Sequence, residues 1–510
     1  MPRVLLTLTA LTTAIAIAAG CGNDDASSSG AASVAPAGSL VYGEATLRPE
    51  GEQKAAIEDL VAKFPGEGSA GDRIGQLMEK AFAESDSGLS YKDDIEPWLG
   101  DEAAFFVSSI SADGEDADAA FLVPTEDEDA TVDAVEKDGD LRKTDHRGHD
   151  LYVSSDEEGA AAVVDGWLVL GNPGGVRTAI DTVEDGESID EDDSYKETLE
   201  DAPEERLGFV YANLPGLYRE LQRTPGAAAL GSFRKIFEEP VLVTANADEA
   251  GVRFEGTVPA TLLTGLPIVA EGTGAAAELP ADAWLALAQP DLGKTIETYL
   301  DLIGSSIGGR DVIEQQFRAE TGLDLEEDVI SWMGDWGVFA RGTSVDELDG
   351  ALFIETSDQA ASGRFIDAVA RLARENADPG DRVGALTLGG GGEGITLNSP
   401  DIPQPIHLFQ RDGKVVMAYG DAAARDALDP GETLAESSAF RDAEEALGGD
   451  YAVSLFVAIE PILALADSAG AASDPDWQKA RPYLEPLGAL VAGARKDGDK
   501  LRSAFGLTVK

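Results

Sequence analysis

The sequence predicts an α+β fold that occurs twice: two tandem homologous domains, each an antiparallel-rich sheet with several helices. Two observations lead to this prediction. A sequence block at 87–101 occurs again, in modified form, at 321–335. The segments around each block follow in the same order in both halves, with strand hairpins in clusters and helices between the clusters. Such clusters favour an antiparallel sheet over a doubly wound parallel one.

The repeated block is the clearest sign of the duplication. A short apolar run follows each copy of it, at 103–107 and at 337–340. Because both tryptophans of the block come just before these strand-like runs, we expect Trp98 and Trp332 to anchor cores rather than to bind ligands. Six positions recur in step between the copies: Gly88, Leu89, Asp94, Trp98, Gly100 and Asp101 return as Gly322, Leu323, Asp328, Trp332, Gly334 and Asp335.

Helical and hairpin signals flank the block in both halves. Downstream, the strand-like segment 118–123 corresponds to 349–354. An Asp-Gly pair between β-prone runs, a strong hairpin signal, stands at 165–166 and again at 412–413. Each copy closes with another hairpin, around Ala250-Gly251 and around Asp497-Gly498. Upstream, an amphipathic helical spacing is shared by Ile57, Leu60, Val61 and Phe64 and by Ile296, Tyr299, Leu300 and Ile303.

The two copies set the expected domain boundaries. Residues 1–20 are expected to form a lipoprotein signal peptide, and 21–40 a lipidated cysteine with a flexible stalk. The first repeat domain is expected at 41–261 and the second at 281–510. The segment 262–280, rich in Gly and Ala, is expected to link them.

The composition is globular but strongly acidic. The 510 residues include 43% hydrophobic residues, and 96 Asp and Glu face 38 Lys and Arg, which gives a formal net charge of −58. Such a charge repels phosphate backbones and excludes nucleic-acid binding. A solvated surface, cation binding and a basic partner all remain open as explanations. The acidic runs at 113–118, 126–129 and 190–193 lack the alternating ligands and central glycine of a calcium-binding loop.

The N-terminal segment reads as an export signal. Arg3 precedes an apolar stretch, 4–19, which has the length of a signal h-region rather than of a membrane span. The sequence Ala18-Ala19-Gly20-Cys21 resembles the lipobox of bacterial lipoproteins, and this resemblance implies that Cys21 carries a lipid. Cys21 is also the only cysteine, so no intramolecular disulfide can form. We therefore expect a location on the extracytoplasmic face of the cell membrane, held by a lipid anchor.

The repeated block also resembles a bacterial family, the proteins with domain of unknown function 3352. Members carry a Gly-Leu-Asp-like segment leading into Asp-x-x-x-Trp-Leu-Gly-Asp/Glu and an apolar strand, as residues 322–340 do here. The resemblance covers most of the chain after the signal segment. It implies a cell-envelope location, but no established activity and no catalytic residues.

Two motifs resemble catalytic or phosphate-binding signatures. Residues 304–308 fit Gly-x-Ser-x-Gly, but they follow a predicted helix, whereas the nucleophile needs a strand-to-helix turn. We expect a loop that ends the helix. Gly293-Lys294-Thr295 lacks the preceding glycine of a phosphate-binding loop, because Ala288 stands there, so we expect ordinary first-turn residues. The Gly-rich run 389–392 is expected to be a flexible loop.

The histidines offer a weak metal candidate. Asp145, His146, His149 and Asp150 lie close together and could contribute ligands to a zinc-like ion. Arg147 would repel such an ion, and a polar hairpin is the favoured interpretation. We therefore expect no metal and no other cofactor. The third histidine, His407, stands apart.

No combination of nucleophile, base or metal ligands in the sequence defines a reaction. We expect a non-enzymatic binding or structural protein of the cell envelope, whose partner is an envelope protein or a small ligand. Two alternatives stay open. One is a solute- or lipid-binding carrier with its site between the two repeats, and the other is an enzyme with an unrecognised site.

Overall fold

The chain forms two compact units, residues 1–258 and 259–510, which are considered separately. The division falls three residues before the expected end of the first repeat domain at 261. The computed structural model describes the following residues: 30–84, 89–111, 116–137, 141–200, 202–203, 205–223, 234, 237–259, 274–307, 309–386, 388, 393–498 and 500–510. The expected signal peptide, Cys21, most of the expected linker and the Gly-rich run 389–392 lie outside these residues.

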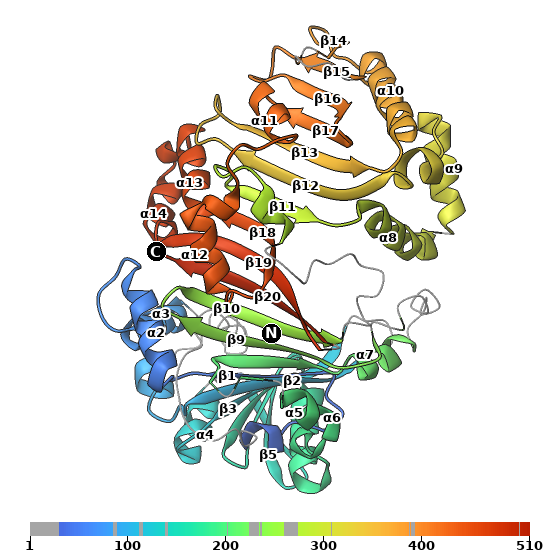
Figure 1. The fold of residues 1–510 in the computed structure, drawn as a ribbon. Helices are drawn as coiled ribbons and strands as arrows, with labels where there is room; N and C mark the ends of the chain where they lie inside the picture. The colour runs from blue at the N-terminus through green and yellow to red at the C-terminus, as the bar shows by residue number, and fades with distance from the viewer. Residues whose placement is uncertain are drawn as a thin grey trace. The chain divides into compact units, whose positions relative to one another are not determined.

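Unit 1 alternates hairpins with helices (Figure 1). Its elements are η1 (Gly30–Ser33), β1 (Val41–Thr46), α2 (Gly51–Ala62), α3 (Ala70–Glu84), η2 (Tyr91–Ile95), β2 (Glu102–Ile110), β3 (Ala117–Pro124), α4 (Glu128–Lys137), β4 (Leu141–His146), β5 (His149–Ser154), β6 (Ala160–Val164), β7 (Trp167–Gly171), α5 (Pro173–Asp185), η3 (Ile189–Glu191), α6 (Asp193–Leu199), β8 (Gly208–Ala212), α7 (Leu214–Leu221), β9 (Val241–Asp248) and β10 (Gly251–Pro259).

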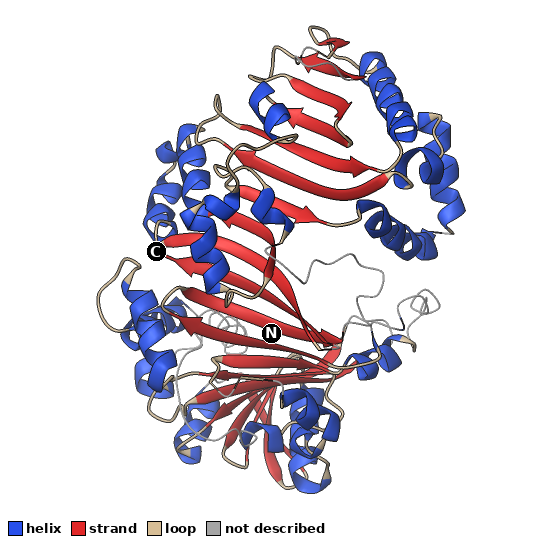
Figure 2. Ribbon diagram, viewed as in Figure 1, coloured by secondary structure: helices blue, strands red, loops and turns tan. Residues whose placement is uncertain are grey.

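Unit 2 has the same alternation (Figure 2). Its elements are η6 (Ala275–Glu278), β11 (Leu285–Gln289), α8 (Leu292–Ile307), α9 (Arg310–Thr321), η7 (Leu325–Ile330), β12 (Met333–Arg341), β13 (Asp349–Thr356), α10 (Gln359–Glu375), β14 (Arg382–Ala385), β15 (Glu393–Asn398), β16 (Ile406–Arg411), β17 (Lys414–Tyr419), α11 (Asp421–Asp426), η8 (Leu434–Glu436), α12 (Ser438–Ala446), β18 (Ala452–Ala458), α13 (Ile459–Ser468), η9 (Ala471–Ser473), α14 (Pro475–Leu484), β19 (Leu487–Asp497) and β20 (Lys500–Val509).

The sheets of the two units have the same strand order. In unit 1 the order is β4–β5–β6–β7–β3–β2–β1–β8–β9–β10, and all these pairs are antiparallel. In unit 2 it is β14–β15–β16–β17–β13–β12–β11–β18–β19–β20, again antiparallel throughout. Each strand of unit 1 therefore has a counterpart in unit 2. The α+β class with antiparallel-rich sheets, predicted from the sequence, is confirmed.

The hairpin turns form where the Asp-Gly pairs predicted them. Asp165 and Gly166 have φ of 50° and 78°, and Asp412 and Gly413 have φ of 51° and 76°. Two successive residues with positive φ make the turn whose twist matches a β-hairpin, and Asp and Gly tolerate that conformation best.

Each sheet packs its two faces differently. In unit 1, α5, η3 and α6 contribute to a core cluster on one face, which contains Tyr42, Phe106, Leu122 and Tyr211. A second cluster with α3, η2 and Trp98 lies over part of the other face, against β5 to β7. Unit 2 repeats this division, with α11, η8 and α12 on one face and α10 with Trp332 over part of the other.

Two helical expectations need correction. Helix α8 continues to Ile307, so Gly304 to Ile307 lie within it and do not form the expected helix-ending loop. A glycine inside a helix costs only about 1 kcal/mol relative to alanine, so Gly304 does not have to end α8. In α2 and α8 the expected buried stripe is incomplete, because Leu60 is buried but Tyr299 is 55% exposed. No helix among the described residues is both long and apolar enough to cross a membrane.

Candidate functional site

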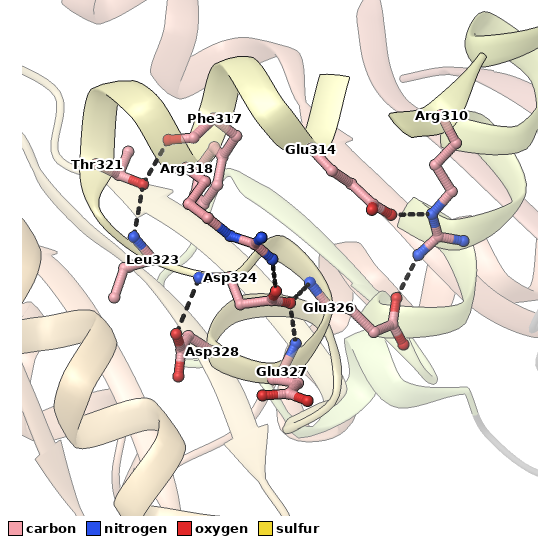
Figure 3. A network of polar contacts seen from close by, with 10 residues as sticks. All are labelled: Arg310, Glu314, Phe317, Arg318, Thr321, Leu323, Asp324, Glu326, Glu327 and Asp328. Atoms are coloured by element: carbon pink, nitrogen blue, oxygen red, sulfur yellow. Dashed lines mark hydrogen bonds and ion pairs between the residues drawn. The ribbon is translucent and has the colours of Figure 1, made fainter. Parts of the chain in front are cut away.

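The repeated block forms a capped turn that leads into a strand. Figure 3 shows it in unit 2, where α9 ends at Thr321 and η7, a π-helical turn, begins after Asp324. The Asp324 carboxylate accepts hydrogen bonds from the N–H groups of Glu326 (3.0 Å) and Glu327 (2.9 Å). In return, the Asp328 carboxylate accepts from the Asp324 N–H at 2.9 Å. These bonds satisfy donors that a helix start leaves free.

The same turn stands in unit 1. There Ser90 is the cap of η2, and its hydroxyl accepts from the Asp93 N–H at 3.1 Å. The Asp94 carboxylate accepts from the Ser90 N–H at 2.9 Å, as Asp328 does in unit 2. In an ordinary capping box the reciprocal carboxylate comes three residues after the cap. Here it comes four residues after the cap. The wider i to i+5 turn accounts for the extra residue, because the Glu96 N–H bonds to the Tyr91 carbonyl.

Both tryptophans of the block are tied to this turn. The indole N–H of Trp332 donates to the Asp328 carbonyl at 2.9 Å, and that of Trp98 donates to the Asp94 carbonyl at 2.5 Å. Trp332 is 0% exposed and Trp98 is 3% exposed. The prediction that both are core anchors is confirmed.

A cation from the helix after the third strand of each unit holds the aspartate of the block. Lys137 of α4 donates to Asp94 at 2.8 Å, and Arg364 of α10 donates to Asp328 at 2.7 Å. The ammonium group of Lys137 and the Ser90 N–H together lower the pKa of Asp94. The recurring Asp and Trp side chains of the block are thus engaged within their own unit, so they serve architecture.

The start of α8 is also capped internally. The Asp291 carboxylate accepts from the Lys294 N–H at 3.0 Å, and the Asp291 N–H donates to Asp335 of the block, also at 3.0 Å. A Cβ on Gly293 would lie 2.8 Å from the Ile330 carbonyl oxygen, which explains the glycine there. Lys294 and Thr295 are ordinary first-turn residues, as the sequence predicted.

The histidine pair lies on a hairpin that docks on α5. Arg147 and Gly148 form the turn between β4 and β5, with φ of 51° and 91°. The His146 Nε2 lies 2.9 Å from Asp181, and the His149 Nε2 lies 2.8 Å from Glu184. Arg147 pairs with Asp181 at 2.8 Å and with Asp185 at 2.6 Å. The hairpin therefore brings three basic side chains onto acidic ones of α5.

The four candidate metal ligands do not converge. The Asp150 carboxylate pairs with Lys143 at 2.8 Å, away from the α5 contacts of the histidines. Asp145 lies opposite Asp150 in the β4–β5 pairing. No group of three or more His, Cys, Asp or Glu in the described part of the chain is placed to hold a metal ion. The polar hairpin that the sequence favoured is the arrangement that forms.

His407 belongs to an arrangement that the sequence did not reveal. Its Nδ1 lies 3.0 Å from the Thr396 hydroxyl and its Nε2 lies 2.8 Å from Asp421. The order resembles a hydroxyl–imidazole–carboxylate triad, but a nucleophile must be accessible. Thr396 is only 2% exposed, whereas the Asp421 side chain is 58% exposed. The accessible end is thus the carboxylate, and the trio anchors α11 to β16.

A continuous apolar row crosses the sheet of unit 2 on the face opposite the core cluster of α11, η8 and α12. Strand pairing joins its members one by one, and they are Met417, Leu352, Val338, Leu287, Leu455, Ala492 and Phe505. Met417 is 51% exposed, Phe505 is 39% exposed, and the five residues between them are all partly exposed. We call this set the open row. It is the candidate functional site.

A second apolar row runs beside the open row on the same face. Its members are Tyr419, Gly350, Ala340, Leu285, Val457, Leu490 and Leu507. All of them are partly exposed. Two adjacent apolar rows that stay partly exposed across seven strands make this face a candidate interaction site.

The corresponding row of unit 1 also crosses seven strands, but one of its ends is covered. Its members, joined by the same strand pairings, are Leu170, Phe121, Phe105, Gly43, Val210, Val243 and Gly256. Val210 is 38% exposed and Val243 is 37% exposed, but Leu170 is buried beneath the cluster of α3 and Trp98. Phe105 lies across Gly43, whose added Cβ would come within 2.4 Å of its ring.

These features describe a duplicated α+β domain with an internally bonded motif and an open apolar sheet face. The chain belongs to the DUF3352 family: the family model, described as a protein of unknown function, matches residues 3–449. The family resemblance seen in the repeated block is thereby confirmed. No curated protein matches the chain.

Among solved structures, crystal forms of TP0453 are similar to parts of the chain. Form III is 8% identical, covers 46% of this chain and 80% of its own, and has a TM-score of 0.24. Form IV is 9% identical, covers 47% and 87%, and also has a TM-score of 0.24. Similarity this low supports no conclusion about this chain.

Proposed function

We propose that this protein is a lipid-anchored binding protein on the extracytoplasmic face of a bacterial membrane, and that it acts by non-covalent binding rather than by catalysis. The open row of unit 2 is the observation that carries the proposal. Large apolar patches on folded proteins mark sites for partners, membranes or ligands. Burying this row in a complex would contribute about 25 cal/mol for each Å² of apolar surface.

The sequence supports the anchor. Cys21 is the only cysteine and stands at the one position where the lipobox needs it. Two or three acyl chains on such a residue suffice for stable attachment. Binding rather than reaction is favoured at His407, because the Thr396 hydroxyl beside its ring belongs to a residue that is only 2% exposed, so a substrate cannot reach it.

Cell fractionation tests the anchor. The native protein is expected in the membrane fraction, released by detergent but not by high salt. A Cys21→Ser variant is expected to leave that fraction after export or to accumulate with its signal segment attached. A mature-sized Cys21→Ser protein that still fractionates with membranes would contradict the anchor.

Co-purification tests the binding role of the open row. The anchored protein would be captured from membranes, and the proteins and lipids that accompany it would be identified by mass spectrometry. We expect a companion that is lost from a Met417→Glu/Phe505→Glu variant, since carboxylates in an apolar contact are costly to desolvate. The matched control is Val312→Glu/Tyr483→Glu, because Val312 is 48% and Tyr483 56% exposed and they lie on α9 and α14, which contribute no member of the row. Equal companions in both variants would contradict the role of the row.

A further inference from the structure

We infer that the open row of unit 2 holds an acyl chain of a membrane phospholipid. This assignment rests on the proposed function and names its ligand.

The row is long enough for an acyl chain. It crosses β17, β13, β12, β11, β18, β19 and β20, and these seven strands have six spacings of about 4.8 Å, which gives about 29 Å. One leaflet of a bilayer has a hydrocarbon thickness of about 15 Å, half of the whole core. An acyl chain laid across the strands therefore fits within the row.

The chemistry of the row favours hydrocarbon over a protein partner. Its side chains are aliphatic or aromatic and contain no nitrogen or oxygen. The backbone groups beneath them are paired with neighbouring strands. Protein interfaces instead form about one hydrogen bond per 100–200 Å² and rely on Tyr, Trp and Arg anchors. The row offers a contact surface without hydrogen-bonding groups, as an acyl chain requires.

Position and charge narrow the ligand further. The chain from Cys21 to Gly30, where the described structure begins, can extend at most about 30 Å, so an anchored protein keeps the start of unit 1 within that distance of the membrane surface. A protein anchored in this way works beside a bilayer, so phospholipids are the apolar chains that surround its anchor. The net charge of −58 disfavours anionic headgroups, so the expected ligand has a zwitterionic or neutral one.

Photo-crosslinking tests the inference on the anchored protein. The protein would be reconstituted in phosphatidylcholine vesicles that contain a phosphatidylcholine with a diazirine on its acyl chain. After irradiation, the crosslinked peptides would be identified by mass spectrometry. We expect adducts on β17, β18 and β20, including the peptides of Met417, Leu455 and Phe505. The Met417→Glu/Phe505→Glu variant should lower their yield about tenfold, as expected when two apolar contacts are lost. The Val312→Glu/Tyr483→Glu control should keep the native yield.

Four outcomes would overturn the inference. Adducts confined to segments outside the open row would show that lipid lies elsewhere. Equal yields in the two variants would show that the row is not the site. Adducts that form equally well with a headgroup-labelled phosphatidylcholine would indicate contact with the membrane surface only. If acyl adducts are absent but a protein companion is lost from the Met417→Glu/Phe505→Glu variant, the binding function stands and the lipid assignment fails.

Discussion

The two units share one strand order, yet their corresponding rows differ. In unit 2 the row is accessible from Met417 to Phe505 and mostly aliphatic. In unit 1 the helical cluster buries Leu170 at one end, and the ring of Phe105 fills the space above Gly43. Duplication of a fold can therefore keep the architecture and change the surface, and the difference points to unit 2 as the binding unit.

The largest expected effect tests what the units have in common. Trp98→Ala and Trp332→Ala should each destabilise their own unit by about 3–5 kcal/mol, because each removes a buried indole and leaves a cavity. Hydrogen exchange resolved by peptide should show the loss of protection in the substituted unit. If one substitution costs less than about 1 kcal/mol, the two blocks would not be equivalent anchors.

The next substitution tests how the row of unit 1 is filled. Gly43→Ala should destabilise unit 1 by about 1–3 kcal/mol, since the new Cβ would collide with the Phe105 ring. Removing side-chain volume at the corresponding position of unit 2 with Leu287→Ala should cost less than about 2 kcal/mol, because Leu287 is partly exposed. The amide hydrogen-exchange rates of β1 and β11 would measure the two stability changes. A neutral Gly43→Ala would mean that Phe105 does not occupy this space.

A smaller effect is expected at the capped turns. Asp94→Ala and Asp328→Ala should each cost about 0.5–2 kcal/mol, since each leaves the N–H of the cap residue without its acceptor. Hydrogen exchange resolved by peptide, measured with increasing denaturant, would report the stability of each unit separately. If one substitution leaves the stability of its unit unchanged while the other lowers it, the two capped turns would not be equivalent.

The smallest effect is a dependence of unit 1 on acid. The folded state lowers the pKa of Asp94 from its ordinary value of 3.8, mainly through the hydrogen bond from Lys137. Its contribution is therefore fully present above that value and is lost as the pH falls through the lowered pKa. The stability of the Asp94→Asn variant should approach that of the native protein as the pH falls below 3.8 and through the lowered pKa of Asp94. If the free energies of unfolding of the two proteins keep a constant difference as the pH falls, the ionised Asp94 carboxylate does not stabilise unit 1.

The sequence predicted the features that short segments determine. Asp-Gly pairs specify their hairpins through φ angles of two residues, and the tryptophan block specifies its turn through contacts within a few positions. Repetition of both allowed one copy to confirm the other. The partners of His146 and His149 were not predictable, because they lie on a helix 35 residues away.

The open row could not be read from the sequence either. Its seven members come from strands between 285 and 505, and only their pairing places them side by side. Irregular pairing between Met333 and Trp336, and between Val453 and Leu455, also shifts the alternation of faces. A register error of one residue would move the whole set to the opposite face.

Quenching of site-specific probes tests the central claim most directly. Because Cys21 is the only cysteine and lipidation would block its thiol, Met417→Cys, Val210→Cys and Val312→Cys can each carry a single fluorophore on the anchored protein. In vesicles whose phosphatidylcholine has a quencher on the acyl chain, we expect strong quenching at position 417 and little at 210 or 312. Equal quenching at 417 and 210 would contradict the assignment of binding to unit 2, and no quenching at 417 would contradict the acyl chain itself.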